Sequence, residues 1–256
     1  MRAFYLACLV SLITLSATLL ALTNPGLALT NTGVRIALHR KASTTSGICT
    51  SYTPNADQLP CSEYSVTAPA TGASLVYVVA ALGDPGAGIS LVSMGVDFDG
   101  RDETSPGAGD AHGIAPQYTS WIACANGLPL VDDGPFGGWP KPQSGLSITW
   151  ANDSCQNTVI GGTVHAVIGA FYLYAYSEDV FRITPNTAYS SQNPELRVSD
   201  CQGGDTDLLA VYPSELWATL TGRVHFGGDG SQGFSPCATT PVVPTSWGRM
   251  KARFTN

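Results

Sequence analysis

A group of acidic residues follows one apolar segment and is the best candidate for cation binding. Residues two apart in a strand point to the same side, so Asp97 and Asp99 place two carboxylates together. Calcium takes about 6–8 hard oxygen ligands. The sequence predicts a calcium site made of Asp97, Asp99, Asp102 and Asp110, and no other cofactor. Arg101 breaks the match to an EF-hand loop, so a solvated acidic loop is the alternative.

Aromatic residues in or near two long polar segments are the other candidates for ligand binding. Exposed Trp rings stack on flat faces of ligands such as sugars. Trp139 lies among Gly and Pro residues, so we expect it to be exposed and to bind a ligand with Phe136. Trp121 and Trp150 alternate with apolar residues, which favours the core. The alternative for Trp139 is a ring that caps the end of the fold.

No catalytic motif is recognisable in the sequence. The histidines are scattered, and His112 alone lies in the acidic loop. The chain contains no G-x-S-x-G, no H-E-x-x-H and no phosphate-binding loop. These observations favour a non-catalytic module that binds protein or carbohydrate, or a surface-structural module. The alternative is a secreted hydrolase with an unrecognised site between the long loops.

The N-terminal residues 1–28 resemble a secretory signal peptide. Arg2 precedes a largely apolar stretch, and Gly26 and Ala28 suit a cleavage site. A transmembrane anchor is the alternative, but Pro25 ends the stretch and no charged flank follows. We therefore expect an exported protein, located outside the cell, at its surface or in the periplasm, with no membrane contact after cleavage.

The charge of the chain argues against polyanionic partners. Its 12 Lys and Arg against 19 Asp and Glu give a formal charge of -7. Such an acidic chain is a poor candidate for binding nucleic acid or anionic membranes.

The cysteines predict a disulfide framework. Cys8 leaves with the signal peptide, and an even number remains, as expected for an exported chain: Cys49, Cys61, Cys124, Cys155, Cys201 and Cys237. Nearest-neighbour pairing is favoured, because each bridge would then close one long loop. The predicted pairs are Cys49–Cys61, Cys124–Cys155 and Cys201–Cys237. A metal site is disfavoured, because the chain has no C-x-x-C spacing.

The elements that position these residues are strands. Residues 75–100 contain two apolar runs around a Gly- and Pro-rich break at 83–88, which predicts a central hairpin. The first run is apolar on both faces, and the second alternates as if one face were wet. About nine strands are expected in total, at residues 34–40, 75–82, 92–98, 118–125, 146–150, 159–176, 180–184, 195–199 and 223–226. Residues 159–176 form one strand or two split at Gly161-Gly162, and Pro213 limits a helical patch at 207–220.

This pattern predicts an all-β protein, an antiparallel β-sandwich with long loops. Residues 29–238 form its single domain. Residues 239–256 form a Pro-containing linker and a basic tail with Arg249, Lys251 and Arg253. The tail is either exposed and partly ordered or a sorting or docking segment that an export or surface component recognises.

The segment GISLVSMGVDFD at residues 88–99 resembles the strand pattern G-I-x-x-V-x-x-x-V-x-F-D of cohesin-like β-sandwiches. A later Gly161-Gly162 turn and the apolar run 167–176 extend the resemblance. The chain departs from that family in its six cysteines and two long polar loops. The resemblance implies a cohesin-like, immunoglobulin-like or carbohydrate-binding-module-like fold and a binding role. The whole chain is also similar to exported bacterial proteins that carry no assigned activity.

Overall fold

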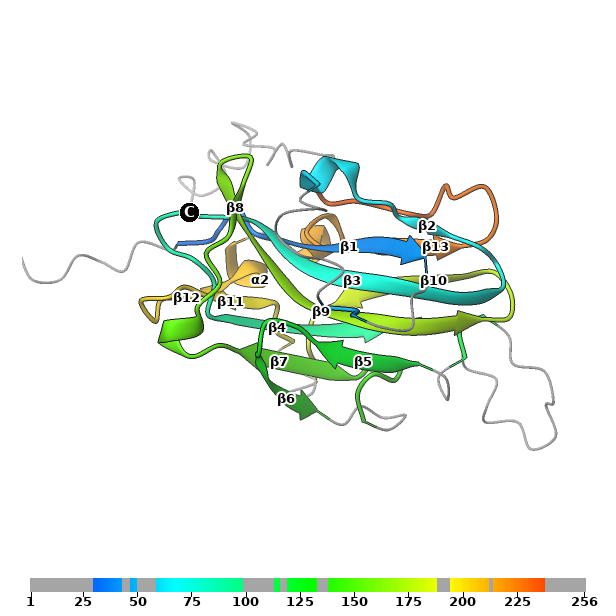
Figure 1. Cartoon of the computed structure of the whole chain (residues 1–256), viewed down its shortest axis with the longest axis horizontal. Helices are drawn as coiled ribbons and strands as arrows, with labels where there is room; N and C mark the ends of the chain where they lie inside the picture. The colour runs from blue at the N-terminus through cyan, green and yellow to red at the C-terminus, as the bar shows by residue number, and fades with distance from the viewer. Residues whose placement is uncertain are drawn as a thin grey trace, which may run out of the picture.

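Two β-sheets pack against each other around one large apolar core (Figure 1). The structure is a computed structural model, and it describes residues 30–42, 47–49, 59–98, 113–115, 119–132, 138–187, 194–211 and 214–237. The predicted signal peptide and the basic tail lie outside these residues. The predicted all-β sandwich is confirmed.

The first sheet is built on the two longest strands. β3 (Gly72–Gly83) pairs with β9 (Thr163–Ala175), and β1 (Arg35–Ala42) and β5 (Ser120–Ala123) extend the sheet on either side. β8 (Val159–Ile160) turns into β9 through Gly161 and Gly162, whose φ angles are 58° and 86°. Two consecutive positive φ angles suit a tight hairpin turn, which explains why glycine stands at both positions. Of the two alternatives for residues 159–176, the structure therefore has two strands split at Gly161-Gly162.

The second sheet has shorter strands. Its path runs through β12 (Asp205–Asp207), β11 (Arg197–Ser199), β4 (Leu91–Asp97), β10 (Asp179–Thr184), β13 (Arg223–Phe226) and β2 (Thr67–Ala68). β7 (Gly145–Thr149) pairs with β4, and β6 (Leu128–Asp132) pairs with β7. β2 and β13 are parallel. The described residues thus contain strands β1 to β13 rather than about nine, because β2, β6, β8 and β12 add short strands.

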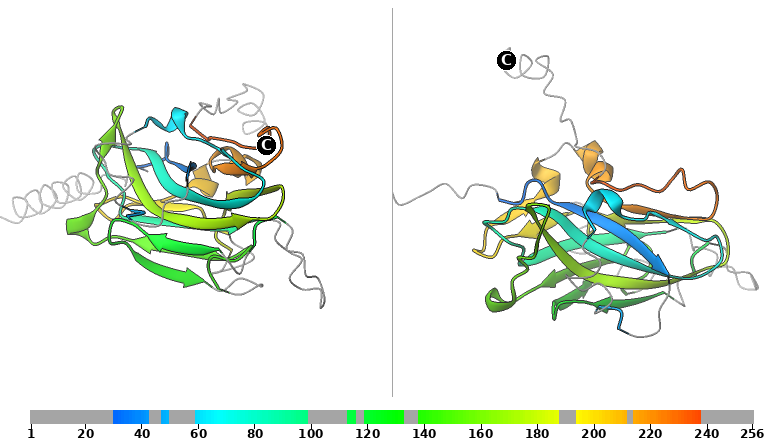
Figure 2. Two further views of the ribbon diagram at one scale, coloured as in Figure 1. Left: turned by 45° about the vertical axis from the view of Figure 1, so that its right-hand side comes forward. Right: turned by 45° about the horizontal axis from the view of Figure 1, so that its top comes forward.

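The predicted central hairpin is wrong. β3 pairs with β1 and β9, whereas β4 pairs with β7, β10 and β11 in the other sheet. The Gly- and Pro-rich segment between β3 and β4 is therefore a crossover between two layers (Figure 2). Gly and Pro residues favour a change of direction in both arrangements, so they do not distinguish a hairpin from a crossover.

Both faces of β3 are buried, as its sequence predicts. Val76 and Val78 lie in the large core between the sheets. Leu75, Tyr77 and Val79 lie in a second apolar cluster on the outer face of the first sheet, together with Cys61 and Tyr64. A segment held by disulfides therefore covers the sheet from outside.

The face of β4 that carries Ser93 and Asp97 is buried rather than exposed to solvent. Ser93 is fully buried and its hydroxyl oxygen accepts hydrogen bonds from Ser147 Oγ (2.9 Å) and Asn186 Nδ2 (3.1 Å). Ser93 donates in turn to Glu195 Oε1 at 2.8 Å. The predicted solvated face is wrong, because residues on either side of a later loop, Asn186 and Glu195, supply the hydrogen bonds that water would otherwise supply.

All six cysteines expected to form disulfides do so, but the predicted pairing is wrong. The bridges are Cys49–Cys124, Cys61–Cys237 and Cys155–Cys201, with Cα–Cα distances of 5.3, 5.4 and 5.9 Å. None of these is a predicted pair, although Cys155–Cys201 does join two consecutive cysteines. Each bridge ties together segments that are far apart along the chain, with separations of 75, 176 and 46 residues.

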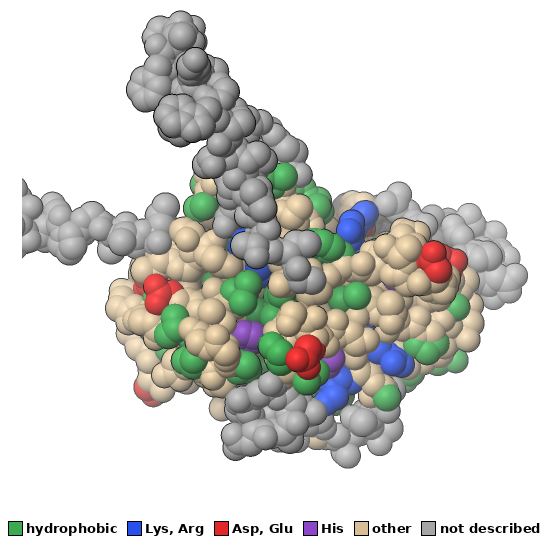
Figure 3. Space-filling model, turned by 90° about the horizontal axis from the view of Figure 1, so that it is seen from above, with side chains coloured by type: hydrophobic (Ala, Val, Ile, Leu, Met, Phe, Trp, Pro, Cys, Tyr) green, Lys and Arg blue, Asp and Glu red, His purple; other side chains and the backbone are tan. Residues whose placement is uncertain are grey.

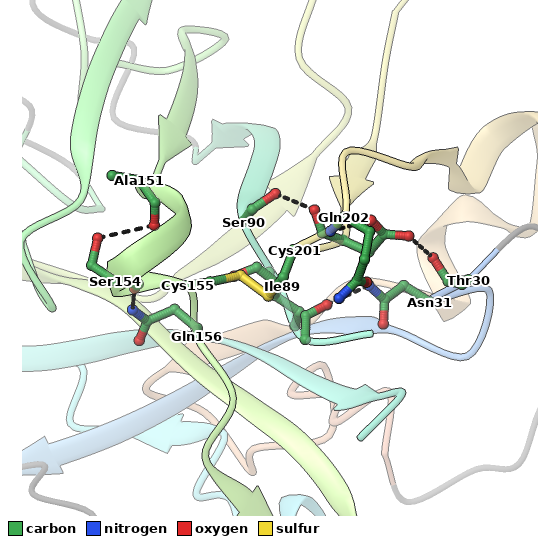
Figure 4. Close-up of a disulfide and its surroundings, with 12 residues drawn as sticks. Thr30, Asn31, Ile89, Ser90, Ala151, Ser154, Cys155, Gln156, Cys201 and Gln202 are labelled. Carbon is green, nitrogen blue, oxygen red and sulfur yellow. Dashed lines mark hydrogen bonds between the residues drawn. A yellow bond between two sulfur atoms is a disulfide. The ribbon is translucent and has the colours of Figure 1, made fainter. Parts of the chain in front are cut away.

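The Cys155–Cys201 bridge lies beside the crossover from β3 to β4 (Figure 4). Ile89 and Gln156 exchange two backbone hydrogen bonds of 2.8 and 2.9 Å, and Cys201 N donates to Ala87 O at 2.9 Å. Asn31 Nδ2 donates to Gly88 O at 2.7 Å. Hydrogen bonds from Gln156, Cys201 and Asn31 thus hold the crossover in place.

Helical structure is brief, as Pro213 predicts. In the described residues it comprises η1 (Cys61–Glu63), η4 (Asn152–Ser154), α2 (Leu208–Val211) and η5 (Ser214–Thr219). Among these residues no helix has the length and apolar character needed to cross a membrane.

Peptide mapping under non-reducing conditions tests the disulfide pairing. We expect cross-linked peptides for Cys49–Cys124, Cys61–Cys237 and Cys155–Cys201. Loss of one such bridge should lower the free energy of unfolding by about 2–5 kcal/mol, because the unfolded chain gains conformational freedom. A peptide that joins Cys49 to Cys61 would contradict the fold.

Acid titration of stability tests the role of Asp200. Burial alone would raise the pKa of Asp200, but hydrogen bonds from Thr30, Gly204, Gln202 and Gly203 outweigh it and lower the pKa. This stabilisation is complete above the unfolded pKa of about 3.9 and is lost as the pH falls through the folded pKa. We therefore expect Asp200→Asn to lower the free energy of unfolding at pH 7 by about 1–2 kcal/mol and to flatten its decline below pH 4.

The matched control is Asp153→Asn, which removes the same charge from an exposed residue of η4. Urea unfolding at several pH values provides the measurement. An Asp200→Asn variant as stable as the wild type at pH 7 would show that this carboxylate does not hold the turn.

Candidate functional site

A pocket of about 380 Å³ opens beside β4, β10 and β13 in the second sheet. It is lined by Asp97, Phe98, Glu178, Asp179, Val180, Arg182, His225 and Gln232. A volume near the lower end of the range for ligand pockets suits a small ligand or a single side chain.

The register of the strands explains why polar groups gather here. Arg182 of β10 lies opposite Asp97 of β4, and Val180 lies opposite His225 of β13. Directly paired residues share a face of the sheet. On β10 the alternating residues Phe181 and Ile183 are fully buried in the core, so Asp97, Arg182 and His225 belong to the outer face.

Asp97 is held by a cation. Arg182 forms an ion pair with Asp97 Oδ2 through Nη2, and its Nε donates to the same oxygen at 3.2 Å. The Asp97 side chain is 10% exposed, whereas Arg182 is 46% exposed. Asp97 Oδ1 is buried and has no hydrogen-bond partner among the described residues. One oxygen of this carboxylate is therefore unused by the fold.

His225 also has a buried polar atom without a hydrogen-bond partner among the described residues. Its Nε2 lies 2.8 Å from Glu178 Oε1, and its side chain is 1% exposed against 56% for Glu178. Because a carboxylate only accepts, the shared proton is assigned to Nε2. Within the described part of the chain, His225 Nδ1 is buried and lacks a partner. In the neutral ring this nitrogen is an acceptor.

The Asp179 carboxylate accepts hydrogen bonds from the backbone and so has a structural role. Its Oδ2 accepts from the backbone N–H of Ile114 at 2.8 Å, and its Oδ1 accepts from that of Val180 at 2.6 Å. A side chain at Gly113 would collide with the Asp179 carboxylate, 2.6 Å from the Cβ position, which explains the glycine. Asp179 thus anchors the segment that returns to β9.

One of the predicted calcium ligands lies among the described residues. Asp97 lines the pocket, while Asp99, Asp102 and Asp110 lie outside the described residues, as does His112. No group of three or more His, Cys, Asp or Glu side chains suited to a metal occurs in the residues that are described. Calcium binding stays a prediction, and Arg182 already occupies one oxygen of Asp97.

The expected exposed tryptophan is half-buried. Trp139 packs edge-on against Trp121, with centroids 5.4 Å apart, and lies 5.3 Å from the Phe171 ring. Exposure of Trp139 was predicted from the flanking Gly and Pro residues, but the core supplies two aromatic contacts, so its position matches the alternative, a capping ring. Trp150 is buried as expected, and Trp121 is half-buried against the core. Phe136 lies outside the described residues, and ligand binding by Trp139 and Phe136 stays a prediction.

The pocket residues Glu178, Arg182 and His225 were missed by the sequence analysis. Arg182 and His225 lie in short strands in which a polar residue reads as solvent-exposed. The available signal was the alternation in residues 179–184, DVFRIT, which places Val180 and Arg182 opposite Phe181. The pairing of β10 with both β4 and β13 was not readable from this pattern.

The surface seen from above carries few charges. Acidic and basic side chains are scattered there over a mostly uncharged surface (Figure 3). The chain has 12% charged residues, about half of the usual ~25%. Among the described residues, this face shows no dense basic patch of the kind that nucleic-acid binding needs.

Comparison with known proteins gives one similarity of structure. No family model and no curated protein matches the chain. Among solved structures, the chain is similar to a type II cohesin domain from the cellulosome of Acetivibrio cellulolyticus, with 11% identity and a TM-score of 0.31. The match covers 56% of this chain and 82% of that domain. The β-sandwich assignment stands on the two sheets themselves.

Proposed function

We propose that this protein is an exported, non-catalytic module that binds a polypeptide partner, and that the pocket beside β4, β10 and β13 is its recognition site. The observation that carries the proposal is the pair of buried, unpartnered polar atoms, Asp97 Oδ1 and His225 Nδ1, on side chains that line one pocket. A buried polar atom without a partner costs about 1–3 kcal/mol, so its retention favours a role with a ligand.

The lining favours binding over hydrolysis. The described residues of the lining include no Ser, Thr or Cys beside His225 that could serve as a nucleophile. Asp97 is paired with Arg182, and Asp179 is bonded to backbone amides. These carboxylates are therefore engaged by the fold rather than free to exchange protons.

Export is supported by the disulfides. Three bridges join all the cysteines that follow the predicted signal peptide. Structural disulfides form and persist in oxidising compartments. The periplasm, the cell surface and the medium all fit, and the basic tail at 239–256 is a candidate for contact with a surface or export component.

A ligand panel tests the proposal. Mature protein, residues 29–256, is screened by thermal shift against pentapeptides and against oligosaccharides. We expect peptides to raise the melting temperature in proportion to the logarithm of their concentration, because they bind only the folded state. Asp97→Asn should weaken binding and so reduce the shift, whereas Asp153→Asn, a charge-matched exposed control, should keep it.

The same panel includes chromogenic glycosides, esters and peptide amides. Turnover of any of them that Glu178→Gln abolishes would overturn the proposal in favour of the hydrolase alternative. Shifts with oligosaccharides and none with peptides would overturn the choice of a polypeptide partner.

A further inference from the structure

The charges that line the pocket are unbalanced. Asp97, Glu178 and Asp179 contribute three carboxylates, and Arg182 is the lone Lys or Arg in the lining formed by described residues. Arg223 lies opposite Arg182 on the same face, but it is held 5.1 Å from the ring centroid of Phe234 and does not line the pocket. The excess of carboxylates over guanidinium groups favours a cationic ligand.

The two unpartnered atoms, Asp97 Oδ1 and His225 Nδ1, need hydrogen-bond donors. The Asp97 carboxylate oxygen Oδ1 is an acceptor, and His225 Nδ1 is an acceptor in the tautomer that donates from Nε2 to Glu178. An ammonium group offers three donors and a guanidinium group five, and neither carries an acceptor. Cationic side chains therefore match both the charge and the donor requirement.

The size and the apolar lining fit one side chain. A volume of about 380 Å³ is small for an extended ligand. Val180 supplies apolar surface beside the carboxylates. Lys and Arg bury an apolar stem while their charged head meets polar groups, so such a pocket suits them.

We infer that the pocket binds the side chain of a lysine or arginine presented by a partner polypeptide. This inference rests on the proposed function and names its ligand. Glu178 at the exposed rim attracts the cation, and Asp97 Oδ1 and His225 Nδ1 accept from its N–H groups inside.

Matched pentapeptides test the inference. The probes are Ala-Ala-Xaa-Ala-Ala with Lys, Arg, norleucine or Glu as Xaa, titrated into ¹⁵N-labelled mature protein. We expect the Lys and Arg peptides to shift the amide resonances of Val180, Arg182 and His225. Their Kd should be about tenfold or more lower than that of the norleucine peptide, whose stem is similar but uncharged.

Two variants keep the test independent of folding. Glu178→Gln alters a half-exposed rim residue, and Asp97→Asn alters a buried one while preserving shape. Each should weaken the Lys peptide about fivefold or more, while Asp153→Asn leaves it unchanged.

The outcomes separate the two proposals. Equal binding of the norleucine or Glu peptide, lost in Asp97→Asn, overturns the cationic ligand and keeps the binding module. Peptide shifts that map away from Val180 and His225 overturn the assignment of this pocket. Absence of binding by all four peptides together with substrate turnover overturns both proposals.

Discussion

The double-sided burial of β3 is the constraint on which the other elements depend. Its residues 75–82 are apolar on both faces, so they need cover from inside and outside at once. The second sheet covers the inner face, where Val76 and Val78 are fully buried. The outer face needs a further layer, and Tyr64 with Cys61 provides it. Bridges to distant parts of the chain hold that layer in place, because it is too small to form a core alone.

The same constraint decides where β4 goes and hence where the pocket forms. A hairpin partner would stay in the sheet of β3, whereas an inner cover must lie in the opposite layer. The crossover, fixed by Cys155–Cys201 and by Asn31, delivers β4 to that layer. β4 then ends at Asp97 against Arg182 of β10. The pocket thus lies at the place where the crossing strand meets two strands from the C-terminal half.

Sequence patterns predicted the secondary structure of segments that depends on neighbouring residues. They failed where the structure depends on contacts with residues far away in the sequence. The apolar run 75–82 and the glycine pair 161–162 act through nearest neighbours, so their strand and turn were predictable. The pattern predicts that Ser93 is exposed to solvent, and only the fold shows that it is buried and hydrogen-bonded to Asn186. The disulfide pairs failed for the same reason, since sequence proximity does not measure distance in a two-layer fold. Among the residues that line the pocket, Asp97 alone was predicted as a candidate site residue. The sequence does not show that His225 and Glu178 contact each other, and this contact is what marks them as site residues.

The tautomer of His225 provides the most direct measurement of the pocket as a binding site. Long-range ¹H–¹⁵N NMR correlations of the imidazole, assigned with a His225→Gln variant, report which nitrogen carries the proton. The contact with Glu178 assigns a proton to Nε2, and the unpartnered Nδ1 predicts a resonance shift centred on that nitrogen when the lysine pentapeptide is added. A ring protonated at Nδ1, or imidazole signals unmoved by saturating peptide, would contradict the presence of an open acceptor in the pocket.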